Sequence, residues 1–323
     1  MTTIRWGIIG CGDVTEVKSG PAFQKANNST LVAVMRRNGD LAKDYAKRHN
    51  VPKWYQDANQ LITDPNVNAI YISTPPAYHK DYTLACAKAG KPIYVEKPMA
   101  MNYSECLEMI SGCETAEVPL FVAYYRRALP RFVKLKQLVD KGVIGIPRIV
   151  SIKNYQKPMV SRDTKELPWR VIPEISGGGL FMDVGCHTLD IMDYLLGPIK
   201  AASGYTGNQG QLYAPEDTIS ASFSFECGVL GSGLWCFSAF ESHDRNEIIG
   251  TEGKLRFSTF GNEPIILTTR SGITEISTKT PIHIQQPLVQ AIVNELLGQS
   301  NSPSTGKTAA RTNWVMEQII EGI

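Results

Sequence analysis

The chain has 323 residues, of which 20% are charged and 43% are hydrophobic. This is the composition of a soluble globular protein with a sizeable core, and the length suits two domains of about 150 residues each. The 33 Lys and Arg residues nearly balance the 31 Asp and Glu residues, which argues against a surface for nucleic acid, and no apolar run reaches the roughly 18 residues of a membrane helix.

The N-terminal stretch reads as a strand, because it lacks the charged region, apolar segment and cleavage site of a secretory signal. The seven cysteines are scattered and form no C-x-x-C pair, so we expect buried thiols and no zinc ribbon or thioredoxin-like motif. The five histidines show no spacing typical of metal ligands, and no metal site is predicted. We therefore expect a cytoplasmic protein without a membrane segment.

The first 124 residues alternate short apolar segments with helical patterns. Such β-branched segments are typical of parallel strands that are buried on both faces. The predicted strands cover 4–9, 30–35, 69–73, 93–95 and 120–123, and the predicted helices cover 41–48, 58–63, 79–88 and 104–113. This alternation predicts a doubly wound parallel sheet with right-handed crossovers, as in a dinucleotide-binding Rossmann domain over 1–124.

The patterns after residue 124 differ. Apolar and serine side chains alternate over 219–225, which is typical of a strand with one buried face. Further strand patterns cover 148–155, 229–238 and 254–258, and helical patterns cover 131–141, 180–196, 287–297 and 308–320. Together they predict a C-terminal α+β domain over 125–323 with an open, largely antiparallel sheet.

A glycine-rich loop follows the first predicted strand directly. Gly10 allows a tight turn, and Gly12 lets backbone N–H groups approach a pyrophosphate at a helix N-terminus. Thr15 stands where G-x-G-x-x-G has its third glycine, which weakens the motif, and a purely structural glycine turn is the alternative. The predicted cofactor contacts in this loop are Gly10, Cys11, Gly12, Asp13 and Val14.

The end of the second predicted strand bears on the choice of dinucleotide. An acidic residue about 20 positions beyond the loop binds the ribose 2′-OH of NAD in such domains. This chain has Arg36 and Arg37 in that region, and guanidinium groups bind a 2′-phosphate that a carboxylate would repel. We therefore predict that NADP(H) is preferred and that NAD(H) is possible. The alternative is an exposed basic turn.

Two further motifs carry side chains that can act on a substrate. The first, Glu96-Lys97-Pro98, ends a predicted parallel strand, at the sheet edge where doubly wound folds bind ligands. Pro98 favours an extended backbone at Lys97. A lysine there can polarise a carbonyl or hold a sugar hydroxyl. The alternative is a surface lysine that pairs with Glu96.

The second motif begins with the glycines at 177–179 and continues through Asp183 and His187. A spacing of four residues places both side chains on one face of a helix, and the glycines give a flexible or closely packed entry to it. A histidine that titrates near neutral pH can move a proton, and a carboxylate can orient it. The alternative is a core histidine that is bonded to an aspartate.

In order and spacing, these motifs resemble the glucose–fructose oxidoreductase, inositol dehydrogenase and MocA family over nearly the whole chain. The resemblance implies that Lys97, Asp183 and His187 line the site beside the nicotinamide. In that family the histidine exchanges a proton, and the lysine binds and polarises the reacting oxygen. The resemblance also implies sugars, polyols, inositols or sugar nucleotides as substrates, and a homo-oligomer, dimer or tetramer, that forms through the C-terminal sheet.

Further contacts follow from the same resemblance. The chain departs from the family at Pro76, where relatives often have Asn, and at Tyr125, where many also have Asn. Both departures alter the expected pocket near the nicotinamide. The segment after the second strand is similar to that of NADP-dependent 1,5-anhydro-fructose reductases and dihydrodiol dehydrogenases. The implied cofactor contacts are Thr74, Pro75, His79, Glu96 and Lys97, and the implied substrate contacts are Tyr125, Tyr155, Trp169 and Arg170.

These inferences predict an NADP(H)-dependent oxidoreductase that transfers a hydride between nicotinamide and a carbonyl or hydroxyl carbon of a sugar, polyol or related small molecule. Two alternatives on the same fold stay open. One is a redox-assisted, NAD-dependent glycoside hydrolase, which Arg36 and Arg37 argue against. The other is a non-enzymatic dinucleotide sensor, which has no need to keep Lys97, Asp183 and His187.

Overall fold

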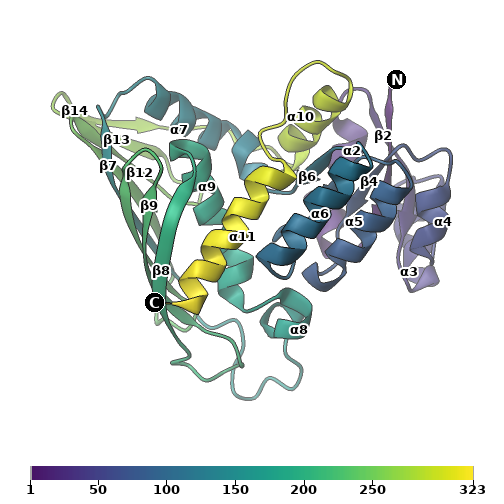
Figure 1. Ribbon diagram of the computed structural model, residues 1–323, viewed down its shortest axis with the longest axis horizontal. Helices are drawn as coiled ribbons and strands as arrows, with labels where there is room; N and C mark the ends of the chain where they lie inside the picture. The colour runs from purple at the N-terminus through teal and green to yellow at the C-terminus, as the bar shows by residue number, and fades with distance from the viewer. Residues whose placement is uncertain (1, 323) are drawn as a thin grey trace. The chain divides into compact units, whose positions relative to one another are not determined.

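The computed structural model describes residues 2–322, and the chain forms two compact units (Figure 1). The first unit contains the residues up to Leu129 and the segment Pro281–Ala310, and the second contains Pro130–Thr280 and the residues from Arg311 onward. The sequence predicts 281–310 in the second domain, but this segment belongs to the first unit. The reason is helix α10 (Gln286–Leu296), whose apolar residues Leu288, Val289, Ile292 and Val293 are buried in the core of the first unit.

A six-stranded parallel sheet with the order β3-β2-β1-β4-β5-β6 forms the centre of the first unit. The strands are β1 (Ile4–Ile9), β2 (Ser29–Met35), β3 (Lys53–Tyr55), β4 (Ala69–Ile72), β5 (Ile93–Val95) and β6 (Leu120–Val122). All but the short edge strand β3 were predicted. The strand order reverses between β1 and β4, and the crevice at such a switch point is where doubly wound sheets bind ligands.

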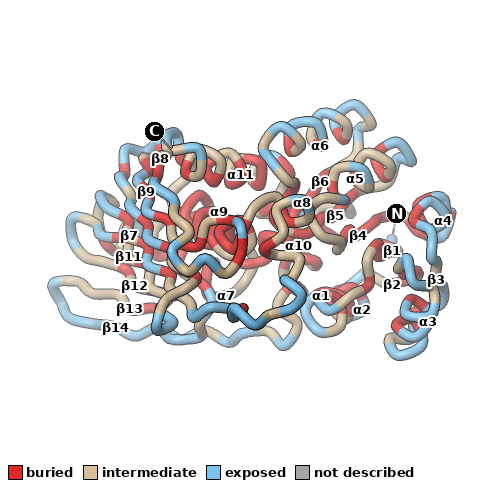
Figure 2. The backbone as a smooth tube through the Cα atoms, turned by 90° about the horizontal axis from the view of Figure 1, so that it is seen from below, coloured by how far each residue is buried: buried red, intermediate tan, exposed pale blue. Residues whose placement is uncertain are grey.

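Helices cover both faces of this sheet (Figure 1). On one face, Trp6 and Ile8 of β1 pack with Phe23 and with α10; on the other face, Gly7 closely approaches Leu61. Figure 2 shows β4 and β5 as buried strands. The helices are α1 (Asp13–Val17), α2 (Gly20–Lys25), α3 (Gly39–Arg48), α4 (Ala58–Thr63), α5 (His79–Lys88) and α6 (Tyr103–Thr115), and the last four confirm the predicted helices.

An eight-stranded sheet with the order β14-β13-β12-β11-β7-β10-β9-β8 dominates the second unit. Its neighbours are antiparallel except β10 and β7, which are parallel. This confirms the predicted open, largely antiparallel sheet. The strands are β7 (Pro147–Tyr155), β8 (Ile199–Gly207), β9 (Thr218–Phe225), β10 (Leu230–Cys236), β11 (His243–Gly250), β12 (Gly253–Phe257), β13 (Ile265–Thr269) and β14 (Gly272–Ile276).

One face of this sheet is covered by helices and the other is open. Phe132 of α7 (Pro130–Asp140) packs edge-on against Phe257 of β12, and Phe181 packs edge-on against Trp235 of β10. Helices α9 (Cys186–Leu196) and α11 (Gly306–Glu321) complete the unit, and α11 begins in the part of the chain that belongs to the first unit. The predicted alternation over 219–225 is confirmed, because its apolar side chains are buried whereas Ser220 and Ser222 are exposed.

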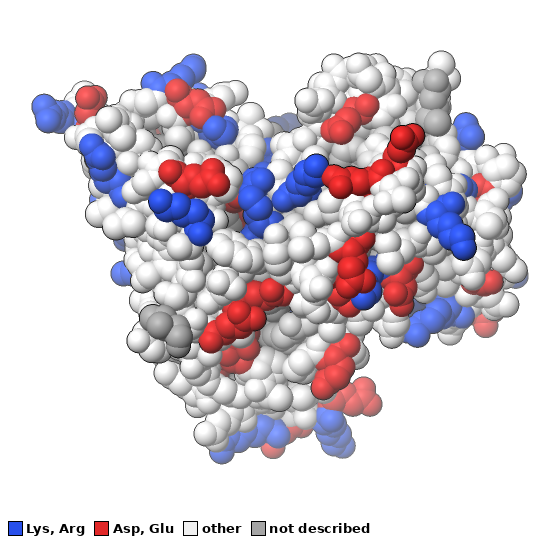
Figure 3. All heavy atoms as spheres, viewed as in Figure 1, with Lys and Arg blue, Asp and Glu red and all other residues white. Residues whose placement is uncertain are grey.

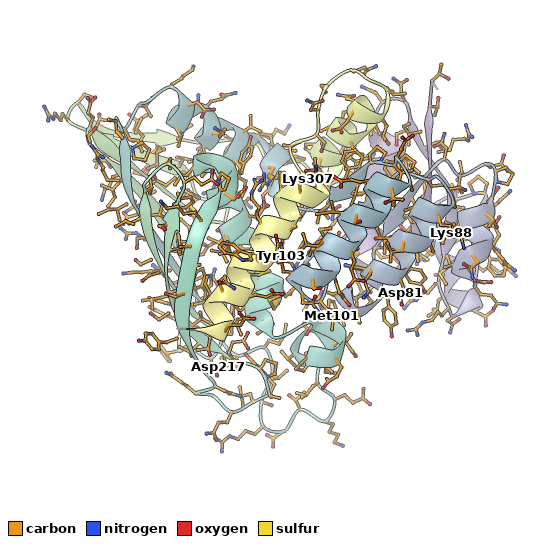
Figure 4. All side chains as sticks on the ribbon, in the orientation of Figure 1. Asp81, Lys88, Met101, Tyr103, Asp217 and Lys307 are labelled. Carbon is orange, nitrogen blue, oxygen red and sulfur yellow. The ribbon has the colours of Figure 1, made fainter. Side chains whose placement is uncertain are left out.

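Charged side chains of both signs occur on the face of the molecule in Figure 3. One of the ion pairs joins Lys307, labelled in Figure 4, to Glu114 of α6 (2.8 Å). Among residues 2–322, the helices are too short or too polar to span a bilayer.

Candidate active site

The loop after β1 packs against the loop after β4. Gly10 has φ +94°, a left-handed conformation that favours glycine. A Cβ atom there would lie 3.0 Å from Thr74 Cγ2 and 3.1 Å from the Ser73 carbonyl carbon. The Ser73 hydroxyl also donates to the Gly10 carbonyl (2.9 Å). Glycine is therefore required at position 10, and the predicted cofactor residue Thr74 lies beside it.

The space over Gly12 is open. A Cβ atom there would have one neighbour within 4 Å, the Gly10 carbonyl oxygen at 3.9 Å. Gly12 is also the N-cap of α1, whose first residues are Asp13 and Val14, and no side chain caps the helix there. Thr15 leaves the space open because it is buried and its hydroxyl donates to the Gly12 carbonyl (2.7 Å). The loop therefore fits a pyrophosphate that closely approaches the backbone.

Cys11 faces the core and ties the loop to β2. Its backbone N–H and that of Gly10 both donate to the Met35 carbonyl (3.1 and 2.9 Å). Burial raises the pKa of the thiol to about 11, although the neighbouring Arg36 guanidinium acts in the opposite direction. The side chain is therefore a neutral thiol at pH 7, and what Cys11 offers a ligand is the position of its backbone.

The two arginines follow the carboxyl end of β2, as the glycine-rich loop follows the carboxyl end of β1. The Arg36 N–H donates to the Tyr55 carbonyl (3.1 Å), and its guanidinium is close enough to Cys11 to act on that thiol. The Arg37 guanidinium lies over the Tyr78 ring, 5.4 Å from its centroid. Asn38 caps α3 by accepting from the Leu41 N–H (3.2 Å), so the turn that carries both arginines is fixed at its end.

A buried carboxylate fixes the backbone at Lys97. Glu96 is only 7% exposed. Its Oε1 accepts from the Tyr71 hydroxyl (2.5 Å) and from the Gln285 amide (2.7 Å), and its Oε2 accepts from the Lys97 N–H (3.2 Å). The Tyr94 hydroxyl in turn donates to Gln285 Oε1 (2.7 Å). Glu96 is therefore an internal anchor that holds the segment that contains Lys97, and its predicted contact with a cofactor stays a prediction.

His79 joins the loop after β4 to the loop after β5. Its ring is fully buried, with Nε2 2.7 Å from the Thr74 carbonyl and Nδ1 3.1 and 3.2 Å from the carbonyls of Pro98 and Met99. Burial lowers the pKa of this imidazole, and the carbonyls and Glu96 act against that shift. His79 thus fixes both loops, and its predicted contact with the cofactor stays a prediction. The chain then continues through Met101 to Tyr103, where α6 begins (Figure 4).

In the second unit, three predicted residues form one cluster. Arg170 Nε donates to Asp183 Oδ2 (3.1 Å), and the Arg170 guanidinium lies 4.6 Å from the centroid of the Trp169 ring. Trp169 and Arg170 belong to a short 3₁₀ turn over Trp169–Val171. The predicted substrate pair therefore lies beside the predicted catalytic Asp183, and Arg170 orients and neutralises that carboxylate.

The helix that carries Asp183 and His187 differs from the prediction in its first turn. Phe181–Gly185 is a π-helical turn, and the regular helix α9 starts only at Cys186. A π turn takes more residues than an α turn, so Asp183 and His187 are not stacked as in a continuous α-helix; such turns are frequent at functional sites. At the chain's entry to this helix, Gly179 packs closely against the loop before β9, because a Cβ atom on it would lie 2.6 Å from Pro215 Cβ. Close packing therefore accounts for this glycine.

His187 is nearly buried in the first turn of α9. It is 6% exposed, and the Phe260 ring meets it edge-on with centroids 5.7 Å apart. The next residue, Thr188, bonds to Thr259 through their hydroxyls (3.0 Å). The loop after β12 is therefore the neighbour of the predicted proton-transfer residue.

The two predicted tyrosines lie elsewhere. Tyr125 belongs to the first unit, is 8% exposed, and accepts from Arg126 Nη1 (3.0 Å). Tyr155 ends β7, where Val150, Ile152 and Asn154 are the buried side chains. Because side chains alternate along a strand, Tyr155 faces the open side of the sheet, where its ring stacks on His243 (5.7 Å). The expected substrate contact of Tyr155 stays a prediction.

The predicted site residues therefore fall into two groups, one in each unit, which we call half-sites. The dinucleotide loop, the arginines, Glu96 and Lys97 are in the first unit, and Trp169, Arg170, Asp183 and His187 are in the second. Comparison with known proteins gives both halves a common context. Residues 4–124 match the family model described as "Oxidoreductase family, NAD-binding Rossmann fold", and residues 132–256 match the "GFO/IDH/MocA C-terminal domain". Oxidoreductase P35 from Formosa agariphila is 39% identical over 317 residues, 97% of each chain. The chain belongs to the Gfo/Idh/MocA family of oxidoreductases.

Other members agree with this assignment. Myo-inositol 2-dehydrogenase from Thermotoga maritima is 28% identical over 83% of this chain and 79% of the relative. The structure of levoglucosan dehydrogenase with NADH and levoglucosan superimposes with a TM-score of 0.87 over 99% of this chain and 96% of the other, at 21% identity, and so shares the fold. The predicted family, the α/β fold class and the assignment as an oxidoreductase are confirmed.

Three residues that fix these Gfo/Idh/MocA motifs were not predicted. Gln285 bonds to Glu96 from a position 189 residues away, and no local pattern could link the two. Phe260 lies in a loop whose position depends on the pairing of β12 with β11. Asp244, which accepts from the Phe260 N–H (2.6 Å), belongs to a strand that the sequence pattern did not reveal.

Proposed function

We propose that the protein is an NADP(H)-dependent oxidoreductase that transfers a hydride between nicotinamide and a carbonyl or hydroxyl carbon of a sugar, polyol or related small molecule. The observation that carries the cofactor choice is the pair Arg36 and Arg37 after β2, next to a loop that fits a pyrophosphate. No acidic side chain occupies residues 36–38 to accept from a ribose hydroxyl. The names of the relatives, an inositol dehydrogenase among them, support the substrate class.

The proposed chemistry divides between the two half-sites. The bound nicotinamide supplies or accepts the hydride. The Lys97 ammonium holds and polarises the reacting oxygen, and His187 gives that oxygen a proton during reduction or takes it during oxidation. Asp183 orients His187 or binds a substrate hydroxyl, with its own carboxylate held by Arg170. The proposal therefore includes that Lys97 of the first unit and His187 of the second unit contact the same substrate.

Paired titrations with NADPH and NADH test the cofactor assignment. We expect the wild-type protein to bind NADPH more tightly and Arg36→Asp to reverse or abolish the preference, because a carboxylate repels the 2′-phosphate. Arg5→Asp is the matched control, since Arg5 lies near the start of β1, at the opposite end of the parallel strands from Arg36. An unchanged ratio of affinities in Arg36→Asp would refute the assignment. Protein that purifies with NAD already bound would favour the glycoside hydrolase.

Turnover of the single variants tests the catalytic assignment. We expect Lys97→Ala and His187→Ala each to lose about 10²–10⁴-fold in turnover while the affinity for NADPH stays near the wild-type value. Lys88→Ala, at the C-terminal end of α5 (Figure 4), should behave as wild type. Near-normal turnover in both site variants would refute the proposed mechanism. A wild-type protein that binds NADPH but turns over no substrate would point to the dinucleotide sensor.

We also propose that the protein is a homo-oligomer that forms through the open face of the eight-stranded sheet. Ile249, Ile149 and Leu230 form one register row across β11, β7 and β10, and they are 36%, 50% and 63% exposed. Contiguous apolar side chains of this kind are typical of a subunit interface. Light scattering should report a dimer or tetramer, and Leu230→Arg should dissociate it. A monomeric wild-type protein would refute this part of the proposal.

The same proposal places the protein in the cytoplasm. Cys227 is an exposed free thiol, which suits a reducing compartment. Fractionation of the source cells tests this placement.

A further inference from the structure

The loop after β12 holds one aromatic ring against His187. Phe260 is 39% exposed and meets the imidazole edge-on with centroids 5.7 Å apart. A partly exposed phenyl ring beside a buried histidine is a feature that the proposed catalytic roles do not use.

Asp244 fixes this loop from the side of the sheet. Its carboxylate accepts from the Thr259 N–H (3.1 Å) and from the Phe260 N–H (2.6 Å). The Thr259 hydroxyl bonds to Thr188 (3.0 Å) and accepts from the Asn246 amide (3.0 Å). The backbone at Phe260 is therefore connected both to β11 and to helix α9, which carries His187.

Arg131 fixes the loop from the side of α7. Its Nη1 donates to the Gly261 carbonyl (2.6 Å), and its Nη2 donates to the Ser258 hydroxyl (3.2 Å). Ser258 donates to the Glu263 carboxylate (2.8 Å). Arg131 is only 9% exposed, and a guanidinium that is removed from water needs partners of this kind. Two charged side chains, Arg131 and Asp244, thus hold this short loop in one conformation through hydrogen bonds.

These hydrogen bonds fix the backbone of Phe260 although its ring is partly exposed. Hydrogen-bonded networks of buried polar groups specify one local structure. Preorganised aromatic rings offer a large contact area at low entropic cost. Phe240, which is 96% exposed, shows by contrast what a phenyl ring at the surface of the same unit looks like without such packing.

We propose that Phe260 determines substrate specificity at the His187 half-site and selects six-membered ring alcohols or ketones over open-chain polyols. The inference rests on the proposed function and deepens it. A cyclic polyol presents a rigid face of C–H groups that can pack against a phenyl ring. An open-chain polyol has no such rigid face, and it loses conformational entropy about its rotatable bonds when it forms one.

The test compares a ring panel (myo-inositol, levoglucosan, glucose) with a chain panel (sorbitol, mannitol, glycerol), using NADP⁺ and NAD⁺ as oxidants. We expect the wild-type protein to have the higher kcat/KM with the best ring compound. Phe260→Ala should reduce the ratio of kcat/KM for ring compounds to kcat/KM for chain compounds by about five- to tenfold, the size of a typical aromatic contact. The change should come chiefly from a higher KM for the ring compounds. Phe260→Trp should keep the ratio, and Phe240→Ala should equal wild type. Calorimetry with the best ring compound checks the loss of affinity without turnover.

The outcomes separate the two claims. If the wild-type protein oxidises none of these compounds and reduces none of the matching ketones, the proposed function fails. If it turns them over but prefers the chain panel, or if Phe260→Ala keeps the wild-type ratio, the assignment of Phe260 alone is wrong. Equal unfolding midpoints for the Phe260 and Phe240 variants exclude misfolding as the cause of a lower ratio.

Discussion

Replacement of Gln285 by Leu tests whether the buried carboxylate next to Lys97 depends on the residue at the N-cap of the distant helix α10. The change removes the donor at Glu96 Oε1 (2.7 Å) and leaves the Tyr94 hydroxyl without its acceptor (2.7 Å). A hydrogen bond to a charged group contributes about 1.5–3 kcal/mol, and a buried polar group without a partner costs about 1–3 kcal/mol. Leucine recovers about 1 kcal/mol through burial of apolar surface. We therefore expect the free energy of unfolding to fall by about 3 kcal/mol.

Urea unfolding, followed by fluorescence and by circular dichroism, measures this loss. Gln290→Ala is the matched control, because Gln290 lies in the helix that begins directly after Gln285 and its contacts to the Asn27 backbone are exposed. We expect that control to change stability by less than about 0.5 kcal/mol. Tyr94→Phe combined with Gln285→Leu should cost less than the sum of the single changes, since both act on one network.

A loss below about 1 kcal/mol in Gln285→Leu would contradict the assigned network, since it would equal only a typical point mutation. Strict additivity with Tyr94→Phe would do the same. Hydrogen exchange adds a local measurement: the Lys97 N–H donates to Glu96 Oε2 (3.2 Å), so peptides that contain Lys97 should exchange faster in Gln285→Leu than in Gln290→Ala.

Two further predictions concern packing and pH. Gly179→Ala would place a Cβ atom 2.6 Å from Pro215 Cβ, so we expect it to destabilise the protein by about 1–3 kcal/mol. Gly207→Ala, where the nearest atom is 3.9 Å away, should cost less than about 1 kcal/mol. Equal melting temperatures of the two variants would contradict this prediction. Burial raises the pKa of Cys11 and Cys113 from 9.0 to about 11, so these thiols ionise in the unfolded chain before they ionise in the folded one. Their contribution of up to about 2–3 kcal/mol each is present below pH 9 and lost as the pH rises from 9 to 11. Urea midpoints across that range should fall less in Cys11→Ala than in wild type, and an equal fall would refute the shift.

The sequence allowed most of the first unit to be predicted because its signals are local. A parallel strand buried on both faces is a short apolar run, and β1, β2, β4, β5 and β6 all match this description. The edge strand β3 does not, because Lys53 and Trp54 are exposed. A strand whose side chains are buried is thus visible in the sequence, as the other edge strand β6 also shows, whereas the exposed edge strand β3 gives no such signal.

The second unit was harder to predict because its sheet has one open face. In β9 the buried positions are strictly apolar and their neighbours are serines, so the pattern was visible. In β11 the buried positions are Asn246 and Ile248, whereas Glu247 is partly buried and Ile249 is exposed. A buried asparagine that bonds to Thr259 (3.0 Å) breaks the alternation of polarity while it preserves the geometry of the strand. This is why β11, and with it Asp244, was missed.

The candidate site shows the same limit at the scale of one residue. The sequence predicts a substrate contact at Tyr155 but does not reveal its face; the structure has Asn154 on the helix-covered face of β7 and Tyr155 on the open one. Asn154 is 2% exposed and pairs in register with Asp244, the residue that fixes Phe260. Because the side-chain period of a strand is two, an error of one position moves a residue from one face to the other. Helical segments tolerate such an error better: the π turn at Phe181–Gly185 shifts Asp183 relative to His187 but keeps both in one segment. Spacing along the chain therefore keeps motif residues within one helix or loop, whereas the face of a residue on a strand depends on the register that the structure supplies.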